Sequence, residues 1–317
     1  MALKVDWHGV YPAVPTQFHD DLSLDIPNTK KHVQDLLSEG IHGLVLLGTI
    51  GENCSLDMEE KKKVLKAIVE VAKDKVPILT GVAEYTTQGA CETVVAAKEV
   101  GVDGIMLLPA LVYKSDEREI MAHYRTVATS TDLPIMCYNN RPVYGVDMSP
   151  ENFKELADVA NIVCIKEASG DVRIITDLIN TLGDRFIFFA GLDDCTLESV
   201  LLGCEGWVSG LVDAFPRENR MLWDYASTGQ WEKALEIYRW YMPMLHFDSH
   251  PKLVQYIKLT CAEMGYGSEL TRPPRLPLVG EERERILSIV RQCAATRPGA
   301  EAAVSYTHLT LPTILLV

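Results

Sequence analysis

The chain has 317 residues, of which 47% are hydrophobic and 23% charged, a balance typical of a globular protein with a sizeable core. Asp and Glu total 44 against 30 for Lys and Arg, so the formal net charge is −14. This acidity argues against nucleic acid or an anionic membrane as a partner, although a locally positive pocket can still take a small anionic substrate.

Eight short apolar runs with strand character alternate with segments of helical spacing. We predict the strands at residues 10–17, 43–48, 76–82, 104–109, 133–139, 162–166, 186–190 and 206–210. Asp25 is placed to cap the first helix, and Asp57 with Glu60 forms a capping box for the second. Ser149 followed by Pro150 has the form of a cap and a first-turn proline for a later helix.

Eight strand–helix units in succession predict one closed (β/α)8 TIM barrel, with its strands and intervening helices in residues 1–215. The alternative is a doubly wound sheet, but its G-x-G-x-x-G fingerprint after a strand is absent. Helical runs at residues 217–226, 231–244, 251–264 and 281–293 exceed what one barrel helix requires. We therefore interpret residues 216–296 as the last barrel helix and a C-terminal helical extension, which is a plausible contact in a homo-oligomer, either a dimer or a tetramer.

The last residues differ in character from the rest of the chain. Residues 297–317 are interpreted as a polar linker followed by a non-native tail, because residues 304–317 resemble translated sequencing-adapter sequence. The alternative is a native apolar tail that docks on a partner subunit.

The cysteines and the N-terminus predict a cytoplasmic protein. None of the eight cysteines forms a C-x-x-C pair and several lie in hydrophobic runs, as expected of reduced, buried thiols. No signal-peptide pattern opens the chain, and no apolar stretch reaches the roughly 18 residues of a membrane helix. His246 and His250 are four residues apart, but Pro251 follows directly and no third ligand is evident, so we expect no metal.

Lys166 ends the apolar run of residues 162–166, which is typical of a strand buried on both faces. Burial lowers the pKa of a lysine and leaves a neutral, nucleophilic amine, which Schiff-base chemistry requires. The alternative is an ordinary lysine whose stem packs while its ammonium group reaches water.

In a (β/α)8 barrel the active site lies at the C-terminal ends of the strands. Those ends are Thr16, Thr49, Glu84, Pro109, Tyr138, Lys166, Asp193 and Gly210. Tyr138 and Lys166 end neighbouring strands, which favours an amine and a phenol side by side. Gly48 and Gly51 flank Thr49, and glycines let backbone N–H groups face an anion near a helix N-terminus. The alternatives are a tight strand-to-helix turn and an amphipathic core tyrosine with its hydroxyl at the rim.

Three segments together resemble the signature of the dihydrodipicolinate synthase/N-acetylneuraminate lyase family: GTIGE at residues 48–52, YN at 138–139 and IKEASGD at 165–171. The resemblance extends from about residue 8 to about residue 292. Members of this family are Schiff-base barrels, usually tetrameric, that act on 2-oxo acids or their cyclic imines. The resemblance implies a lysine imine in place of a cofactor.

The resemblance also implies roles for particular residues. Lys166 is implied as the Schiff-base lysine, Tyr138 as the proton-transferring phenol, and Thr49 as a hydroxyl beside Tyr138. The Thr49–Ile50 backbone, flanked by Gly48 and Gly51, is implied to hold the substrate carboxylate.

The chain departs from the synthase pattern at three places. The synthases have a second hydroxyl residue where this chain has Ile50, and an arginine where it has Val143, with Arg141 standing earlier. They also have a tyrosine pair after the strand-four proline, where this chain has Ala110 and Leu111. These departures leave the usual hydroxyl relay and carboxylate clamp incomplete.

Other segments resemble the 1-pyrroline-4-hydroxy-2-carboxylate deaminases of hydroxyproline breakdown: VYKSD at residues 112–116, YNN at 138–140, GWVSGLV at 206–212 and HPKLVQ at 250–255. This resemblance implies a deaminase that forms 2,5-dioxopentanoate and ammonia. Asn140, Ser209 and Gly210 are then candidate substrate contacts, while roles for Arg141 and Tyr144 stay open. The alternatives are a dihydrodipicolinate synthase, another 2-oxo-acid aldolase or dehydratase of the family, and a non-catalytic ligand-binding barrel.

Overall fold

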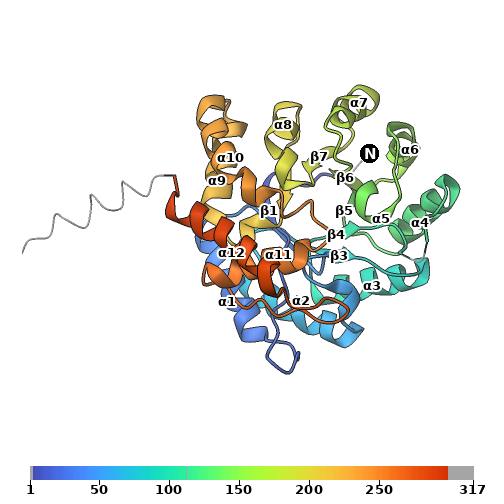
Figure 1. The fold of residues 1–317 in the computed structure, drawn as a ribbon. Helices are drawn as coiled ribbons and strands as arrows, with labels where there is room; N and C mark the ends of the chain where they lie inside the picture. The colour runs from blue at the N-terminus through green and yellow to red at the C-terminus, as the bar shows by residue number, and fades with distance from the viewer. Residues whose placement is uncertain (1–2, 112, 299–317) are drawn as a thin grey trace, which may run out of the picture.

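The computed structural model describes residues 3–111 and 113–298 and confirms the predicted (β/α)8 barrel (Figure 1). The eight strands are parallel and pair in the order β1-β8-β7-β6-β5-β4-β3-β2. They are β1 (Gly9–Pro12), β2 (Leu44–Leu46), β3 (Ile78–Val82), β4 (Gly104–Leu107), β5 (Ile135–Asn139), β6 (Ile162–Glu167), β7 (Ile187–Ala190) and β8 (Gly206–Ser209).

The first strand is shorter than predicted, and this matters for closure of the barrel. The apolar run was expected to continue to residue 17, but β1 ends at Pro12. A single parallel bridge from Ala13 to Val45 then joins the chain after β1 to β2. Thr16 has left the sheet, and its hydroxyl donates to the carbonyl of Gly51 at 2.7 Å. Hydrophobic pattern alone does not show where an apolar backbone leaves its sheet.

Helices follow the strands and surround the barrel (Figure 1). They are α1 (Ile26–Ser38), α2 (Met58–Ala72), α3 (Thr87–Val100), α4 (Glu117–Thr129), α5 (Arg141–Tyr144), α6 (Pro150–Glu155), α7 (Arg173–Leu182), α8 (Thr196–Leu201) and α9 (Pro216–Ser227). The predicted caps are present: Asp25 accepts from Asn28 N, and capping boxes open α2 at Asp57 and α6 at Ser149. The four-residue α5 was not predicted.

Two aromatic rings from different strands pack together in the buried core of the barrel. Tyr11 and Phe189 meet edge to face, with ring centroids 5.2 Å apart. Glycines make room for them: a Cβ on Gly43 would lie 2.1 Å from Tyr11 Cε1, and one on Gly206 would lie 2.2 Å from Phe189 Cζ. This dense packing, typical of barrel cores, closes the interior below the ends of the strands.

Beyond α9 the chain forms the predicted helical extension, α10 (Trp231–Leu245), α11 (Leu253–Glu263) and α12 (Gly280–Ala295). The buried amine of Lys258, on α11, contacts Glu52 Oε1 at 2.9 Å and the carbonyl of Thr16 at 2.8 Å. The extension is thereby tied to the loops that follow β1 and β2.

The eight cysteines are all unpaired thiols: five are buried, Cys91 and Cys195 are partly buried, and Cys54 is exposed, contrary to the expected burial. None of the helices in the described part of the chain has the length and apolar character that crossing a membrane requires. The interpretation of residues 304–317 as a non-native tail lies outside the described residues.

Candidate active site

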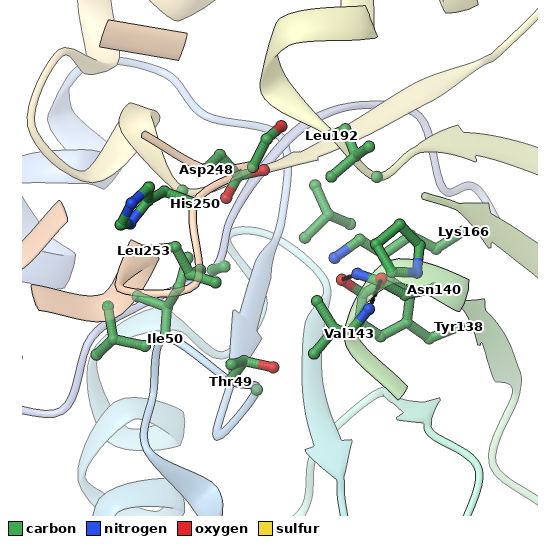
Figure 2. A pocket seen from close by; sticks show the side chains of 18 of the residues that line it. Thr49, Ile50, Tyr138, Asn140, Val143, Lys166, Leu192, Asp248, His250 and Leu253 are labelled. Atoms are coloured by element: carbon green, nitrogen blue, oxygen red, sulfur yellow. Dashed lines mark hydrogen bonds between the residues drawn. The ribbon is translucent and has the colours of Figure 1, made fainter. Parts of the chain in front are cut away.

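A cavity of about 600 Å³ opens at the C-terminal ends of the strands (Figure 2). Seven predicted site residues line it: Gly48, Thr49, Ile50, Tyr138, Asn140, Lys166 and Gly210. Two others, Gly51 and Ser209, are not among the residues that line it. The strand-end residues Thr16, Glu84, Pro109 and Asp193 are likewise absent from its lining.

Lys166 and Tyr138 are direct neighbours. They are register partners on the parallel strands β6 and β5, and side chains in register on adjacent strands point to the same side of a sheet. The Lys166 Nζ atom lies 3.8 Å from the centroid of the Tyr138 ring. Lys166 is only 5% exposed, so its amine faces the cavity rather than bulk water. The alternative of a solvent-reaching strand-end lysine is therefore wrong.

Burial controls the ionisation of Lys166. Desolvation lowers the pKa of Lys166 to about 8, against the opposing charges of Asp248 and Asp193. A lysine with this pKa has an appreciable neutral fraction near neutral pH, as attack on a carbonyl or imine carbon requires.

Asn140 orients the phenol of Tyr138. The Asn140 side-chain oxygen accepts from Val143 N at 3.0 Å as the N-cap of α5, so its amide nitrogen must face the other way. That nitrogen donates to the Tyr138 hydroxyl at 2.8 Å, which leaves the phenolic proton free for another acceptor. Burial raises the pKa of Tyr138 well above its ordinary value, so the resting phenol is neutral.

Thr49 contacts a different tyrosine from the one that the resemblance implies. Its hydroxyl is 2.6 Å from the Tyr144 hydroxyl, and the rings of Tyr144 and Tyr138 meet edge to face at 5.8 Å. Burial raises the pKa of Tyr144 to about 12. The unpredicted helix α5 carries Tyr144 into the cavity lining, so sequence reasoning had no element on which to place it.

The loop after β2 has the compact backbone that its glycines predict. A Cβ on Gly51 would lie 2.7 Å from Leu47 N, so this position must lack a side chain. The expected helix N-terminus beside the loop is wrong, because only the three-residue turn Asn53–Ser55 follows and α2 begins at Met58. Any anion at Thr49 and Ile50 would therefore meet the loop backbone without a helix dipole.

Residues at the end of β8 are divided between structure and cavity. The buried Ser209 hydroxyl donates to Asn219 Oδ1 and accepts from Val212 N, each at 3.2 Å, so its hydrogen bonds stabilise the wall of the cavity. A Cβ on Gly210 would lie 2.7 Å from Ile50 Cδ1 and 3.0 Å from Asp248 Oδ1. The missing side chain of Gly210 thus makes room for both groups.

The helical extension contributes charged residues that sequence reasoning missed. Asp248 lies in the turn between α10 and α11, and Arg275 in the segment between α11 and α12; both line the cavity. Burial raises the pKa of Asp248 to about 6, against the lowering effect of Lys166. The sequence pointed to this region only through the similarity of residues 250–255 to the deaminases, and that similarity named neither Asp248 nor Arg275.

The structure also gives the positions of the arginine and the two histidines that the sequence left without a role. Arg141 is exposed, 3.4 Å from Asp147, while Val143 lies at the rim of the cavity. His246 Nδ1 is 3.0 Å from Asp194 Oδ2, whereas the ring of His250 stacks on Tyr256 with centroids 4.4 Å apart. The two histidines thus have separate partners.

Comparison with known proteins places this geometry in a family. The model of the dihydrodipicolinate synthetase family matches residues 6–293. The chain is 34% identical over 251 residues to a 4-hydroxy-tetrahydrodipicolinate synthase of Desulforamulus reducens, covering 78% of this chain and 85% of that protein. It is 31% identical to the corresponding synthase of Methanothrix thermoacetophila, covering 90% and 96%.

Solved structures give the same result. The chloride-inhibited dihydrodipicolinate synthase of Acinetobacter baumannii, complexed with pyruvate, is similar with a TM-score of 0.85 and 29% identity, covering 90% of this chain and 99% of that one. The dihydrodipicolinate synthase of Aquifex aeolicus has a TM-score of 0.84 and 26% identity, covering 90% and 98%. With the buried lysine, the adjoining phenol and the barrel-mouth cavity in place, the chain belongs to the dihydrodipicolinate synthetase family.

Proposed function

We propose that this protein is a Schiff-base-forming deaminase that converts 1-pyrroline-4-hydroxy-2-carboxylate and water to 2,5-dioxopentanoate and ammonia. The observation that carries the proposal is the buried Lys166 amine, 3.8 Å from the Tyr138 ring centroid at the mouth of the barrel. The substrate is then a small cyclic imine, and the covalent lysine imine takes the place of a cofactor.

The first step is exchange of one imine for another. The neutral Lys166 amine attacks C2 of the ring, the ring opens, and the C5 amine is freed as a lysine imine forms at C2. Because burial holds Tyr138 protonated, its phenol acts first as an acid toward the departing ring nitrogen. The phenolate so formed, beside the Thr49–Tyr144 hydroxyl pair, is a base for the C3 proton, which the imine has made acidic.

Elimination and hydrolysis complete the reaction. Loss of the C3 proton gives an enamine, which expels the C4 hydroxyl as water. The double bond migrates to form an imine at C5, whose hydrolysis releases ammonia. Hydrolysis at Lys166 then frees 2,5-dioxopentanoate.

The lining of the cavity suits a compact ring with one carboxylate. Ile50, Val143, Leu192 and Leu253 provide apolar walls (Figure 2). Arg275 lines the cavity at a partly buried position, with its Nη1 atom 3.9 Å from Glu52 Oε2, and a guanidinium is the side chain suited to bidentate binding of a carboxylate. It is a candidate for the function of the arginine that the synthase pattern has at the position of Val143.

A second candidate function is supported by the relatives. The curated relatives described above are 4-hydroxy-tetrahydrodipicolinate synthases, and the Acinetobacter structure contains pyruvate. A pyruvate-using synthase, or another aldolase or dehydratase for 2-oxo acids, requires the same lysine imine. A synthase differs from a deaminase in joining an aldehyde to bound pyruvate and in releasing no ammonia.

A substrate panel separates these functions. Purified protein is given the 4-hydroxy-pyrroline carboxylate, pyruvate with aspartate semialdehyde, and a set of sugar-derived 2-oxo acids, with ammonia and aldehyde followed in time. We expect ammonia and 2,5-dioxopentanoate from the first substrate and no release by Lys166→Ala. Turnover of pyruvate with aspartate semialdehyde, without ammonia from the pyrroline, would establish the synthase instead. A non-catalytic barrel would turn over none of them.

Location in the cytoplasm and assembly into a dimer or tetramer stay predictions from the sequence. Size-exclusion chromatography with light scattering measures the second directly.

A further inference from the structure

The carboxyl group of Asp248 faces the reacting lysine from the other side of the cavity. Figure 2 shows Asp248 and Lys166 on opposite sides of the open space. Asp248 comes from the turn between α10 and α11, so it is held independently of the strands that carry Lys166 and Tyr138. Its Oδ2 atom accepts from Asp193 N at 3.2 Å, and its Oδ1 atom lies in the space left by Gly210.

The neighbouring carboxyl groups are already engaged. Asp194, which also lines the cavity, accepts from the Ser249 hydroxyl at 2.8 Å and contacts His246 at 3.0 Å. Asp193 is fully buried and accepts from Trp207 Nε1 at 2.9 Å and from Leu211 N at 2.9 Å. These contacts occupy the carboxyl groups of Asp194 and Asp193, whereas Asp248 lines the cavity and its Oδ1 atom has no hydrogen-bond partner among the described residues.

The proposed reaction requires an acid away from Lys166. The lysine imine forms at C2, whereas the bond that breaks in the elimination joins C4 to its hydroxyl oxygen. Tyr138 packs against Lys166 and therefore serves atoms near C2 and C3. Hydroxide is a poor leaving group, so a group on the far side of the substrate must supply a proton as the bond breaks.

We propose that Asp248 is the general acid that protonates the departing C4 hydroxyl, which makes this a site for eliminating a β-hydroxyl group from a lysine imine. The inference rests on the proposed function and deepens it, since it names the class of substrate: 2-oxo acids or their cyclic imines with a hydroxyl at C4.

The step balances. The enamine nitrogen pair re-forms the C=N bond, the C2–C3 π pair moves to C3–C4, and the C4–O bond pair leaves with oxygen. Asp248 gives that oxygen its proton, so water departs and Asp248 is left as a carboxylate. The carboxylate is then near C5 and takes a C5 proton as the double bond migrates, which restores the acid. The raised pKa of Asp248, about 6, fits a carboxyl that exchanges a proton near neutrality.

The test compares leaving groups that differ in their need for an acid. The probes are 4-hydroxy-2-oxopentanoate and 4-fluoro-2-oxopentanoate, which lack the ring nitrogen and therefore do not depend on the deaminase reaction. Fluoride is the conjugate base of a much stronger acid than water and leaves without protonation. The unsaturated 2-oxo acid is followed by absorbance, fluoride by electrode, and imine formation by borohydride trapping.

We expect Asp248→Asn, which keeps the shape and one oxygen acceptor, to lower hydroxyl elimination by about 10²-fold or more, the usual effect of losing a general acid. Trapping above pH 8, where the Lys166 amine is neutral in both proteins, should change little, and so should fluoride elimination relative to trapping. Asp194→Asn makes the same chemical change at the neighbouring carboxyl and should leave the ratio of hydroxyl to fluoride elimination as in the wild type.

The other outcomes overturn the inference. If Asp248→Asn lowered the elimination of hydroxyl and of fluoride equally, or abolished borohydride trapping, Asp248 would be a positioning residue for Lys166. If Asp248→Asn eliminated the hydroxyl at the wild-type rate, Asp248 would have no role as the acid. The same would follow if the wild type eliminated no hydroxyl from either 4-hydroxy-2-oxopentanoate or the hydroxy-pyrroline. Wild-type elimination from the open-chain probe without ammonia from the pyrroline would refute only the proposed function.

Discussion

The amine of Lys166 experiences two opposed influences, and their balance sets its reactivity. Burial lowers its pKa, while Asp248 and, to a smaller extent, Asp193 raise it, with a result of about 8. The sequence showed a lysine at the end of an apolar strand, which predicts the burial. It placed Asp193 at the end of a predicted strand but did not show Asp248, which reaches the cavity from a turn 82 positions further along the chain than Lys166.

The pH dependence of imine formation tests this balance. Below pH 8 the amine is mostly protonated, so the rate of trapping should rise about tenfold per pH unit and level off above pH 8. Because Asp248 raises the pKa, Asp248→Asn should move the midpoint to lower pH. Trapping rates across pH 6 to 10 measure both midpoints. A midpoint near the ordinary lysine value, or a shift to higher pH in the variant, would contradict the electrostatic account.

Other residues divide according to how local their signals are. Tyr138 and Thr49 were found because each stands at the end of a predicted strand, and Ile50 was found only through the family resemblance; all three line the cavity. Ser209 was a candidate through the resemblance to the deaminases, yet its hydroxyl hydrogen-bonds within the wall. Tyr144 and Arg275 were missed or left open, since a side chain on a short helix or in a long loop has no periodicity that reveals its direction.

At the scale of elements, the helical extension is more than an appendage. The Lys258–Glu52 pair joins α11 to the loop that carries Thr49 and Ile50, and both side chains are completely buried. Glu52 also accepts from Arg272 N at 2.9 Å, and its backbone is left-handed, with φ of 55°. An unfavourable backbone conformation at this position is held by contacts from the extension.

Breaking that pair should be costly. Lys258→Met leaves the Glu52 carboxylate buried without its main partner, and we expect the free energy of unfolding to fall by about 3–5 kcal/mol. Lys252→Met is the matched control, because its 2.6 Å pair with Glu282 is partly exposed to solvent and should be worth at most about 1 kcal/mol. Urea denaturation measures both. Similar losses in the two variants would show that burial of the first pair has no special effect.

The predicted elements explain why the fold was accessible from the sequence. Each of the eight strands lies within or within one residue of its predicted run, and α9 to α12 fall on the four predicted helical runs to within a few residues. Strong burial and capping signals are local, so they can be recognised in the sequence without knowing the tertiary contacts. The early end of β1 goes with a contact between loops, the hydrogen bond from Thr16 to Gly51, which no local pattern encodes. Helix α5 has local signals in its Asn140 N-cap, its first-turn proline and Gly145, but four residues are too few to show helical periodicity.

For the molecule as a whole, the amino-acid sequence predicts the barrel fold and the family, while the reaction depends on the residues that line the cavity at the C-terminal ends of the strands. The cavity unites residues from the loop after β2, from β5 and β6, and from turns of the extension more than 80 positions beyond Lys166. Family membership leads us to expect a lysine imine, and the residues that line the cavity determine which substrate forms it. Deaminase and synthase share the first covalent step, so that step is common to both candidate functions.

The most direct test of the account is borohydride reduction in the presence of a 2-oxo acid or the hydroxy-pyrroline, followed by peptide mass mapping. We predict one stable adduct, on Lys166, and none in Lys166→Ala. Lys258 and Lys61 are the internal controls, since both are buried lysines held by carboxylates outside the cavity lining. An adduct on either of them, or no adduct with any substrate of the panel, would contradict the central claim that Lys166 is the covalent catalyst.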